Sequence, residues 1–194
     1  MATRRGSIRE RILRVLLNDP DSNLTKYRVS KNAGASFSWT HEFLPNLEKG
    51  GYVEDAKVLD FEGLIRLWTK LRLKPGGRGY LIQRPLQLLR RTDLDYALTT
   101  YQAENLVQGY LFPSRIDLYV DRGEKYDWHG LLSREGLVGE GNVKILFDDD
   151  NVFYGALDVA GLKVVSPPQL IVDLLLEGGV CVEAAEMLLE KMGG

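Results

Sequence analysis

Apolar residues near the start of the chain recur at helical spacing. Five of them follow the i, i+4, i+5, i+8 pattern that places one stripe on a helix: Ile8, Ile12, Leu13, Leu16 and Leu17. The pattern predicts a helix over residues 7–17, with Ser7 as its N-cap and Glu10 completing a capping box. The turn-forming residues at positions 18–22 are expected to end it.

Three more helices follow, with a strand between the last two. The pattern predicts helices over residues 25–33, 36–49 and 61–71 and a strand over 52–54. Gly34 and Gly50 are expected terminators, and Ser36 is the expected cap of the helix over 36–49. Pro45 lies inside that helix, which predicts either a kink or a later start. Its inner face is expected to hold Phe37, Thr40, Phe43, Leu44 and Leu47.

Beyond residue 79 the pattern alternates between short strands and helices. Strands are predicted over residues 80–83, 96–98, 115–120, 143–147 and 162–165, and helices from residue 85 and over 100–110, 128–135, 167–177 and 182–191. The glycine-rich run at 74–79 is the expected linker. The predicted fold is therefore mixed: an N-terminal winged helix-turn-helix over residues 1–75 and a C-terminal α/β domain over residues 80–194.

Charge divides the chain in the same way. Residues 1–91 hold 18 Lys and Arg against 9 Asp and Glu, a net of +9, whereas residues 92–194 have a net of −11. A basic half beside an acidic half is typical of a polyanion-binding module joined to a unit with another role. An uneven distribution of solvated surface charge is the alternative.

The helix over 36–49 is the expected recognition helix of the motif, and double-stranded DNA is the expected partner. Its early residues Ser36, Ser38, Trp39 and His41 are predicted to reach the base edges in the major groove. Phosphate contacts are predicted for the basic side chains of the preceding helix and of the N-terminus: Lys26, Arg28, Lys31, Arg4 and Arg5. The alternative is a helical unit that contacts only other proteins, with Trp39 in its core.

The acidic half carries few signs of catalysis. The strand at 114–120 resembles the metal-binding strand of nucleotidyltransferases, in which two carboxylates two residues apart hold Mg²⁺. Arg115 stands at the first of those positions and Asp117 at the second, and the upstream Gly-Ser is missing. A degenerate nucleotidyltransferase-like fold and an ordinary half-buried strand both remain open. Asp148-Asp149-Asp150 is expected to be a solvated turn and Cys181 a buried apolar side chain, so no catalytic residue, metal site or cofactor is predicted.

Two segments of the second half resemble the AbiEi-type antitoxins, transcriptional regulators of type IV toxin–antitoxin systems. They are Thr99-Thr100-Tyr101-Gln102-Ala103-Glu104-Asn105 and the run from Val165-Ser166-Pro167-Pro168 to Leu175. The resemblance implies an operator-binding winged helix, autorepression, and a C-terminal domain that opposes a nucleotidyltransferase toxin. The resulting hypothesis is a DNA-binding antitoxin. Its rivals are a nucleotidyltransferase-like enzyme and a protein-interaction module that neutralises a partner.

Location and assembly complete the expectations. No stretch approaches 18 consecutive apolar residues, and the N-terminus has no apolar signal core, so a cytoplasmic protein that does not enter a membrane is predicted. A homodimer is expected, since such regulators act on paired half-sites. The apolar face of the helix over 61–71, or the last helix, is the expected dimer interface.

Overall fold

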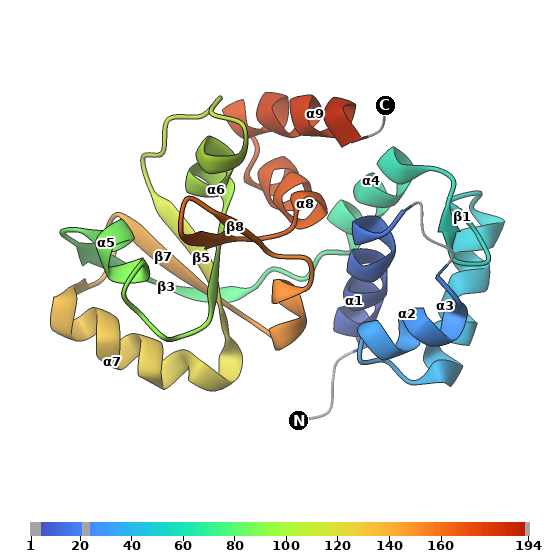
Figure 1. Ribbon diagram of the computed structural model, residues 1–194, viewed down its shortest axis with the longest axis horizontal. Helices are drawn as coiled ribbons and strands as arrows, with labels where there is room; N and C mark the ends of the chain where they lie inside the picture. The colour runs from blue at the N-terminus through green and yellow to red at the C-terminus, as the bar shows by residue number, and fades with distance from the viewer. Residues whose placement is uncertain (1–4, 21–23, 193–194) are drawn as a thin grey trace.

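The computed structural model describes residues 5–20 and 24–192. It is a mixed α/β fold in which a helical unit adjoins a seven-stranded sheet with its own helices (Figure 1). The helical unit contains α1 (Arg5–Asn18), α2 (Lys26–Asn32), α3 (Phe37–Lys49), the hairpin of β1 (Val53–Glu54) and β2 (Lys57–Val58), and α4 (Phe61–Leu71).

Side-chain caps and a shared apolar core account for these helices. The side chains of Thr25, Ser36 and Asp60 accept hydrogen bonds from the backbone N–H groups of Arg28, Trp39 and Gly63, which satisfies donors that a helix start leaves unpaired. The shared core of the unit is buried, and it includes Ile12, Leu16, Val29, Leu44 and Leu47. The predicted cap Ser36 of α3 is confirmed in position and role, whereas the cap Thr25 of α2 was not predicted.

Two local predictions in this unit are wrong, and one of the two alternatives for the helix with Pro45 is excluded. The first helix begins at Arg5, so Ser7 lies inside it and is not its N-cap. Glu10 does not complete a capping box, because its side chain is buried and bonded to Arg72. Phe37 is 51% exposed and does not fill the inner face of α3. The helix with Pro45 inside begins at Phe37, which rules out the later start. The side-chain amide of Asn46 donates to the carbonyl of Glu42 beside the proline.

The sheet has the strand order β6-β3-β7-β5-β4-β9-β8. Its strands are β3 (Gly76–Ile82), β4 (Tyr96–Thr99), β5 (Ile116–Asp121), β6 (Gly136–Val138), β7 (Val143–Asp148), β8 (Leu157–Val159) and β9 (Leu162–Val164). The pairs β5–β7 and β4–β9 are parallel and the other pairs are antiparallel. The α/β prediction for the second half is therefore confirmed at the level of a mixed sheet.

Helices connect and cover these strands. They are α5 (Pro85–Leu89), α6 (Thr100–Val107), α7 (Lys125–Glu135), α8 (Pro167–Glu177) and α9 (Val180–Met192), with short 3-10 turns η1 (Arg122–Glu124) and η2 (Asp150–Phe153). In Figure 1, α8 lies between the sheet unit and the helical unit, and α9 runs along its outer side. The buried α8 thus joins the two halves of the chain.

Two expectations about the second half are corrected by the pairing of its strands. Residues Gly76 to Gly79 pair with β7 and belong to β3, so the glycine-rich run is not a linker. A side chain at Gly77 would meet the carbonyl oxygen of Ile145 at 2.5 Å, which explains why glycine stands there. The strand β5 is central and its first five residues are all buried, so the half-buried strand of the sequence analysis is wrong.

Candidate nucleic-acid interface

The first turn of α3 presents polar side chains to solvent. Ser36, Ser38 and His41 are all exposed, and the ring of Phe37 lies 5.6 Å from the imidazole of His41. These side chains share one end of the helix because Ser36 caps it and the next residues form its first turn. Hydroxyl and imidazole groups both donate and accept hydrogen bonds, so this end of α3 can contact base edges.

Trp39 lies apart from these three residues. Its side chain is half-buried and packs against the core, and the guanidinium of Arg9 stacks 6.0 Å from its ring. The same guanidinium lies 5.8 Å from the ring of Phe43. Trp39 therefore joins α3 to α1 and is not brought onto the exposed face with Ser38 and His41.

The predicted phosphate contacts are only partly available. Arg28 and Lys31 are exposed on α2 and have no ion pair with any described residue. Lys26 is engaged elsewhere, since its ammonium lies 3.1 Å from a carboxylate oxygen of Glu48 and 3.5 Å from one of Asp55. These bonds raise the pKa of Lys26, first through the hydrogen bond to Glu48. The ammonium of Lys26 is thus paired with Glu48 of α3 and with Asp55 of the hairpin turn.

The two arginines at the N-terminus are not placed on this surface. Arg4 lies outside the described residues, and Arg5 is the first residue of α1, with a side chain that is also outside the described part. Sequence reasoning missed Tyr27, which is 63% exposed on α2. Its i, i+4 spacing from Lys31 was the available signal that both side chains share one face of the helix.

The far side of the helical unit is acidic. A cleft of about 420 Å³ beside the hairpin is lined by Glu48, Glu54 and Asp55 with Gly51, Val53 and Leu59. Carboxylates at this position would repel a phosphate backbone. This acidic cleft is therefore less suited to a polyanion than α2 and the first turn of α3.

Much of the positive charge of the first half is used inside the molecule. Three arginines of the helical unit pair with acidic residues of the second half: Arg11 with Asp149 at 3.0 Å, Arg66 with Glu186 at 3.2 Å and Arg72 with Asp148 at 2.9 Å. The opposite charges of the two halves thus also form a complementary contact. The net charge of +9 overstates the charge available to a ligand.

A buried polar network holds the two halves together around Arg72. Its guanidinium lies 2.5 Å from Glu10 and 3.0 Å from the hydroxyl of Tyr119, and its side chain is 3% exposed. Glu10 also accepts hydrogen bonds from the indole of Trp68 and the backbone N–H of Leu73. This buried carboxylate therefore accepts hydrogen bonds from three donors, which is the condition for a stable buried charge.

The ionisation of this network follows from its burial and its pairing. Burial works against the charged form of Arg72, but Tyr119 and the carboxylates of Asp173, Glu10 and Asp148 together raise its pKa above the ordinary value. Burial raises the pKa of Asp173, and Arg72 and the hydrogen bond from Thr99 offset only part of that shift. Arg72 stays charged in the folded protein.

Further polar side chains of α1 lie at the contact between the helical unit and the sheet unit. The guanidinium of Arg14 donates to the side-chain oxygens of Gln169, at 2.8 and 3.1 Å, and of Asn151, at 2.6 Å. The amide of Asn18 donates to the hydroxyl of Ser166 at 3.1 Å. Glu10, Arg14 and Asn18 follow an i, i+4, i+8 spacing and share one face of α1. Arg14 and Asn18 make its polar contact with the sheet unit, and Glu10 faces Arg72.

Nucleotidyltransferases carry two carboxylates on the strand that residues 114–120 resemble. Here the two positions hold an ion pair between Arg115 and Asp117. Arg115 donates to Asp117 through two bonds of 2.6 and 2.7 Å and to Glu177 at 3.0 Å. Asp117 also accepts from Thr100, whose φ of 48° lies in the left-handed region. A guanidinium at this place competes with a divalent cation for the carboxylate. The run Asp148–Asp150 is likewise directed at Arg72 and Arg11.

No group of three or more His, Cys, Asp or Glu in residues 5–20 and 24–192 is placed to hold a metal ion. Over the same residues, no helix is both long enough and apolar enough to cross a bilayer.

Comparison with known proteins identifies no family for this chain. No protein-family model, curated protein or solved structure matches it. The resemblance to AbiEi-type antitoxins therefore depends on the two quoted segments alone.

Proposed function

We propose that this chain is a DNA-binding transcriptional regulator whose helical unit is a winged helix-turn-helix. The order of α1, α2, α3, the β1–β2 hairpin and α4 is the order of that motif. The turn between α2 and α3 contains Gly34 with a φ of 57°, in keeping with the short glycine-containing turn of helix-turn-helix units. In this proposal α3 is the recognition helix and the hairpin is the wing.

One observation carries the proposal: the exposed first turn of α3 follows α2, whose side chains Arg28 and Lys31 have no ion pair with any described residue. Ser36, Ser38 and His41 offer hydrogen-bonding groups to the bases, while Arg28 and Lys31 offer charge to phosphates. The side-chain caps and the buried core hold both helices, so the groups are oriented before DNA arrives.

The test is a salt titration of duplex binding by fluorescence anisotropy. Each phosphate contact contributes about 0.9 to the slope of log affinity against log salt concentration, so Arg28→Gln with Lys31→Gln should lower the slope by about 1.8. The control is Arg134→Gln, an exposed arginine on α7. A slope near zero for the unmodified protein, or equal slopes for the double variant and the control, would contradict the proposal.

Specific readout is tested separately with a selected operator. Ser38→Ala with His41→Ala should reduce the ratio of operator to random-duplex affinity at least tenfold and leave random-duplex affinity within twofold, because base contacts carry the sequence information. Trp39→Phe is the contrast, since Trp39 packs against the core. Equal losses on operator and random duplex would exclude α3 as the recognition helix.

The antitoxin role is the finer part of the proposal, and the resemblance of residues 99–105 and 165–175 supports it. It predicts an adjacent reading frame for a nucleotidyltransferase toxin and restored growth on co-expression. Restored growth without a complex between the toxin and this chain would fit a type IV pair. Unrelieved toxicity would remove the antitoxin role and leave DNA binding untouched.

A homodimer is also part of the proposal, and it needs a surface other than the two expected from sequence. The apolar side chains Leu64, Ile65 and Trp68 of α4 are buried against α1 and α8, and the inner face of α9 is buried on α8. Sedimentation equilibrium at micromolar concentration, with and without operator, measures the oligomeric state.

A further inference from the structure

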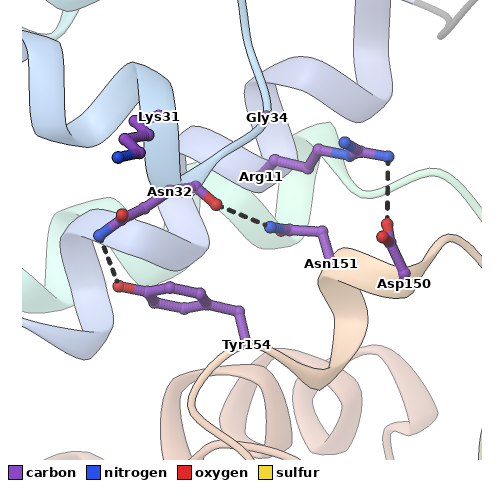
Figure 2. Close-up of a pocket in the computed structure, with 7 residues that line it drawn as sticks. All are labelled: Arg11, Lys31, Asn32, Gly34, Asp150, Asn151 and Tyr154. Atoms are coloured by element: carbon purple, nitrogen blue, oxygen red, sulfur yellow. Dashed lines mark hydrogen bonds and ion pairs between the residues drawn. The ribbon is translucent and has the colours of Figure 1, made fainter.

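A polar cleft of about 330 Å³ lies where α1 and α2 meet the η2 segment of the sheet unit. It is lined by Arg11, Lys31, Asn32, Gly34, Asp150, Asn151 and Tyr154 (Figure 2). A volume of this size accommodates a small molecule. Its walls come from both halves of the chain, so a ligand in it would touch both.

The groups at one end of the cleft are hydrogen-bond donors without acceptors. The ammonium of Lys31 has no partner among the described residues, and Figure 2 shows it on the same side of the cleft as Asn32 and Tyr154. The hydroxyl of Tyr154 accepts a bond of 3.2 Å from the amide of Asn32, which leaves its own hydrogen available. A cation beside a free O–H donor is a suitable pair for an oxyanion.

The negative groups nearby are directed away from these donors. Asp149 and Asp150 face Arg11 at 3.0 and 3.7 Å, and Figure 2 places Asp150 with Arg11 across the cleft from Lys31. The last turn of α2 ends here, and its carbonyl groups are satisfied: the N–H of Gly34 donates to Lys31 and the amide of Asn151 donates to Asn32. The negative end of the helix is therefore covered by donors.

We propose that this cleft binds a small anion through phosphate or carboxylate oxygens, with Lys31 and Tyr154 as its ligands. The anion would contact α2 through Lys31 and the sheet unit through Tyr154, and so would strengthen the contact between the two halves. If the anion holds α2 in place, it should also change the affinity for duplex DNA, and this part rests on the proposed function. Binding of the anion itself does not depend on it.

The experiment follows side-chain amide and backbone resonances by NMR during titration of the full chain, without DNA. The probes are orthophosphate and acetate, each compared with sodium chloride at the same ionic strength. Saturable shifts of the side-chain amides of Asn32 and Asn151 with one or both probes, and none with chloride, are expected. Saturable shifts with phosphate but not acetate, or with acetate but not phosphate, identify the oxyanion that the cleft prefers.

Variants decide whether the donors named here make the site. Lys31→Gln and Tyr154→Phe should each weaken the apparent affinity at least tenfold, while Arg28→Gln, a change of an exposed arginine on the same helix outside the cleft, should leave it within twofold. Both substituted side chains are at least partly exposed, and the backbone spectrum reports whether each variant is folded. Shifts equal to those in chloride, or affinities that neither variant changes, overturn the proposal. Reduced duplex affinity of Lys31→Gln without any anion binding would assign Lys31 to DNA and also overturn it.

Discussion

Replacing Arg72 by Met should destabilise the protein severely, because it removes the cation of a buried network. The side chain is 3% exposed and lies 2.5 Å from Glu10 and 2.9 Å from Asp148, whose side chains are 4% and 13% exposed. Removing one partner of a buried ion pair costs about 3–5 kcal/mol, since the other charge stays buried without compensation. For a chain of this length, the expected fall in melting temperature is about 6–20 °C.

The matched control is Arg66→Met, six positions earlier on the same helix. Arg66 also has two ion pairs, with Glu62 at 2.7 Å and Glu186 at 3.2 Å, but its side chain is 45% exposed. Exposed pairs contribute about 0–1 kcal/mol, so this variant should lose less than about 1 kcal/mol. Urea unfolding followed by circular dichroism measures both variants at pH 7.

The unpaired charge itself can be tested with a double variant. Adding Asp148→Asn to Arg72→Met removes one of the carboxylates left behind and should recover part of the lost stability. Equal losses for Arg72→Met and Arg66→Met, or no recovery in the double variant, would refute the assignment of the loss to a buried unpaired charge.

Three further outcomes follow from the same structure. Leu44→Ala should cost about 2–5 kcal/mol in urea unfolding, because Leu44 is fully buried, whereas Leu59→Ala, at a site 57% exposed, should cost far less. Thr25→Ala should cost about 1 kcal/mol through loss of the cap on α2, and Thr25→Ser should restore most of it. Burial raises the folded-state pKa of Asp173, so its stabilising contribution is complete below the ordinary aspartate pKa and is lost as the pH rises through the raised value. The unfolding free energy of the unmodified protein minus that of Asp173→Asn should therefore fall from about pH 4 upward; a constant or rising difference would contradict it.

The helices and most strands could be predicted because their signals are local. The predicted span of α4 coincides with the observed helix, and α2 differs by one residue at each end, where Thr25 and Ala33 are its caps. The strands β2, β6 and β8 were missed. Each is only two or three residues long and depends on a partner strand, so the sequence around it carries little periodic signal.

The candidate interface could be predicted only in part. Ser36, Ser38 and His41 were found because they follow a capping signal at the start of a helix. Trp39 and Lys26 contact Arg9, Glu48 and Asp55 instead, and the sequence did not indicate these partners because they come from other elements. Sequence spacing fixes the face of a helix on which a side chain lies, but not what packs against that face.

The amino-acid sequence by itself determined where the helices lie, the α/β character of the second half and the opposite charges of the two halves, because these depend on neighbours along the chain. Only the tertiary structure decided how that charge is used. The stripe of Glu10, Arg14 and Asn18 has the spacing of an ordinary solvated face of a helix. Arg14 and Asn18 are nevertheless bonded to η2, to α8 and to its cap, and Glu10 is bonded to Trp68 and Arg72. The physical reason is that a buried charge requires hydrogen-bonding partners, and here the partners of Glu10 and Arg14 lie more than fifty residues away in sequence.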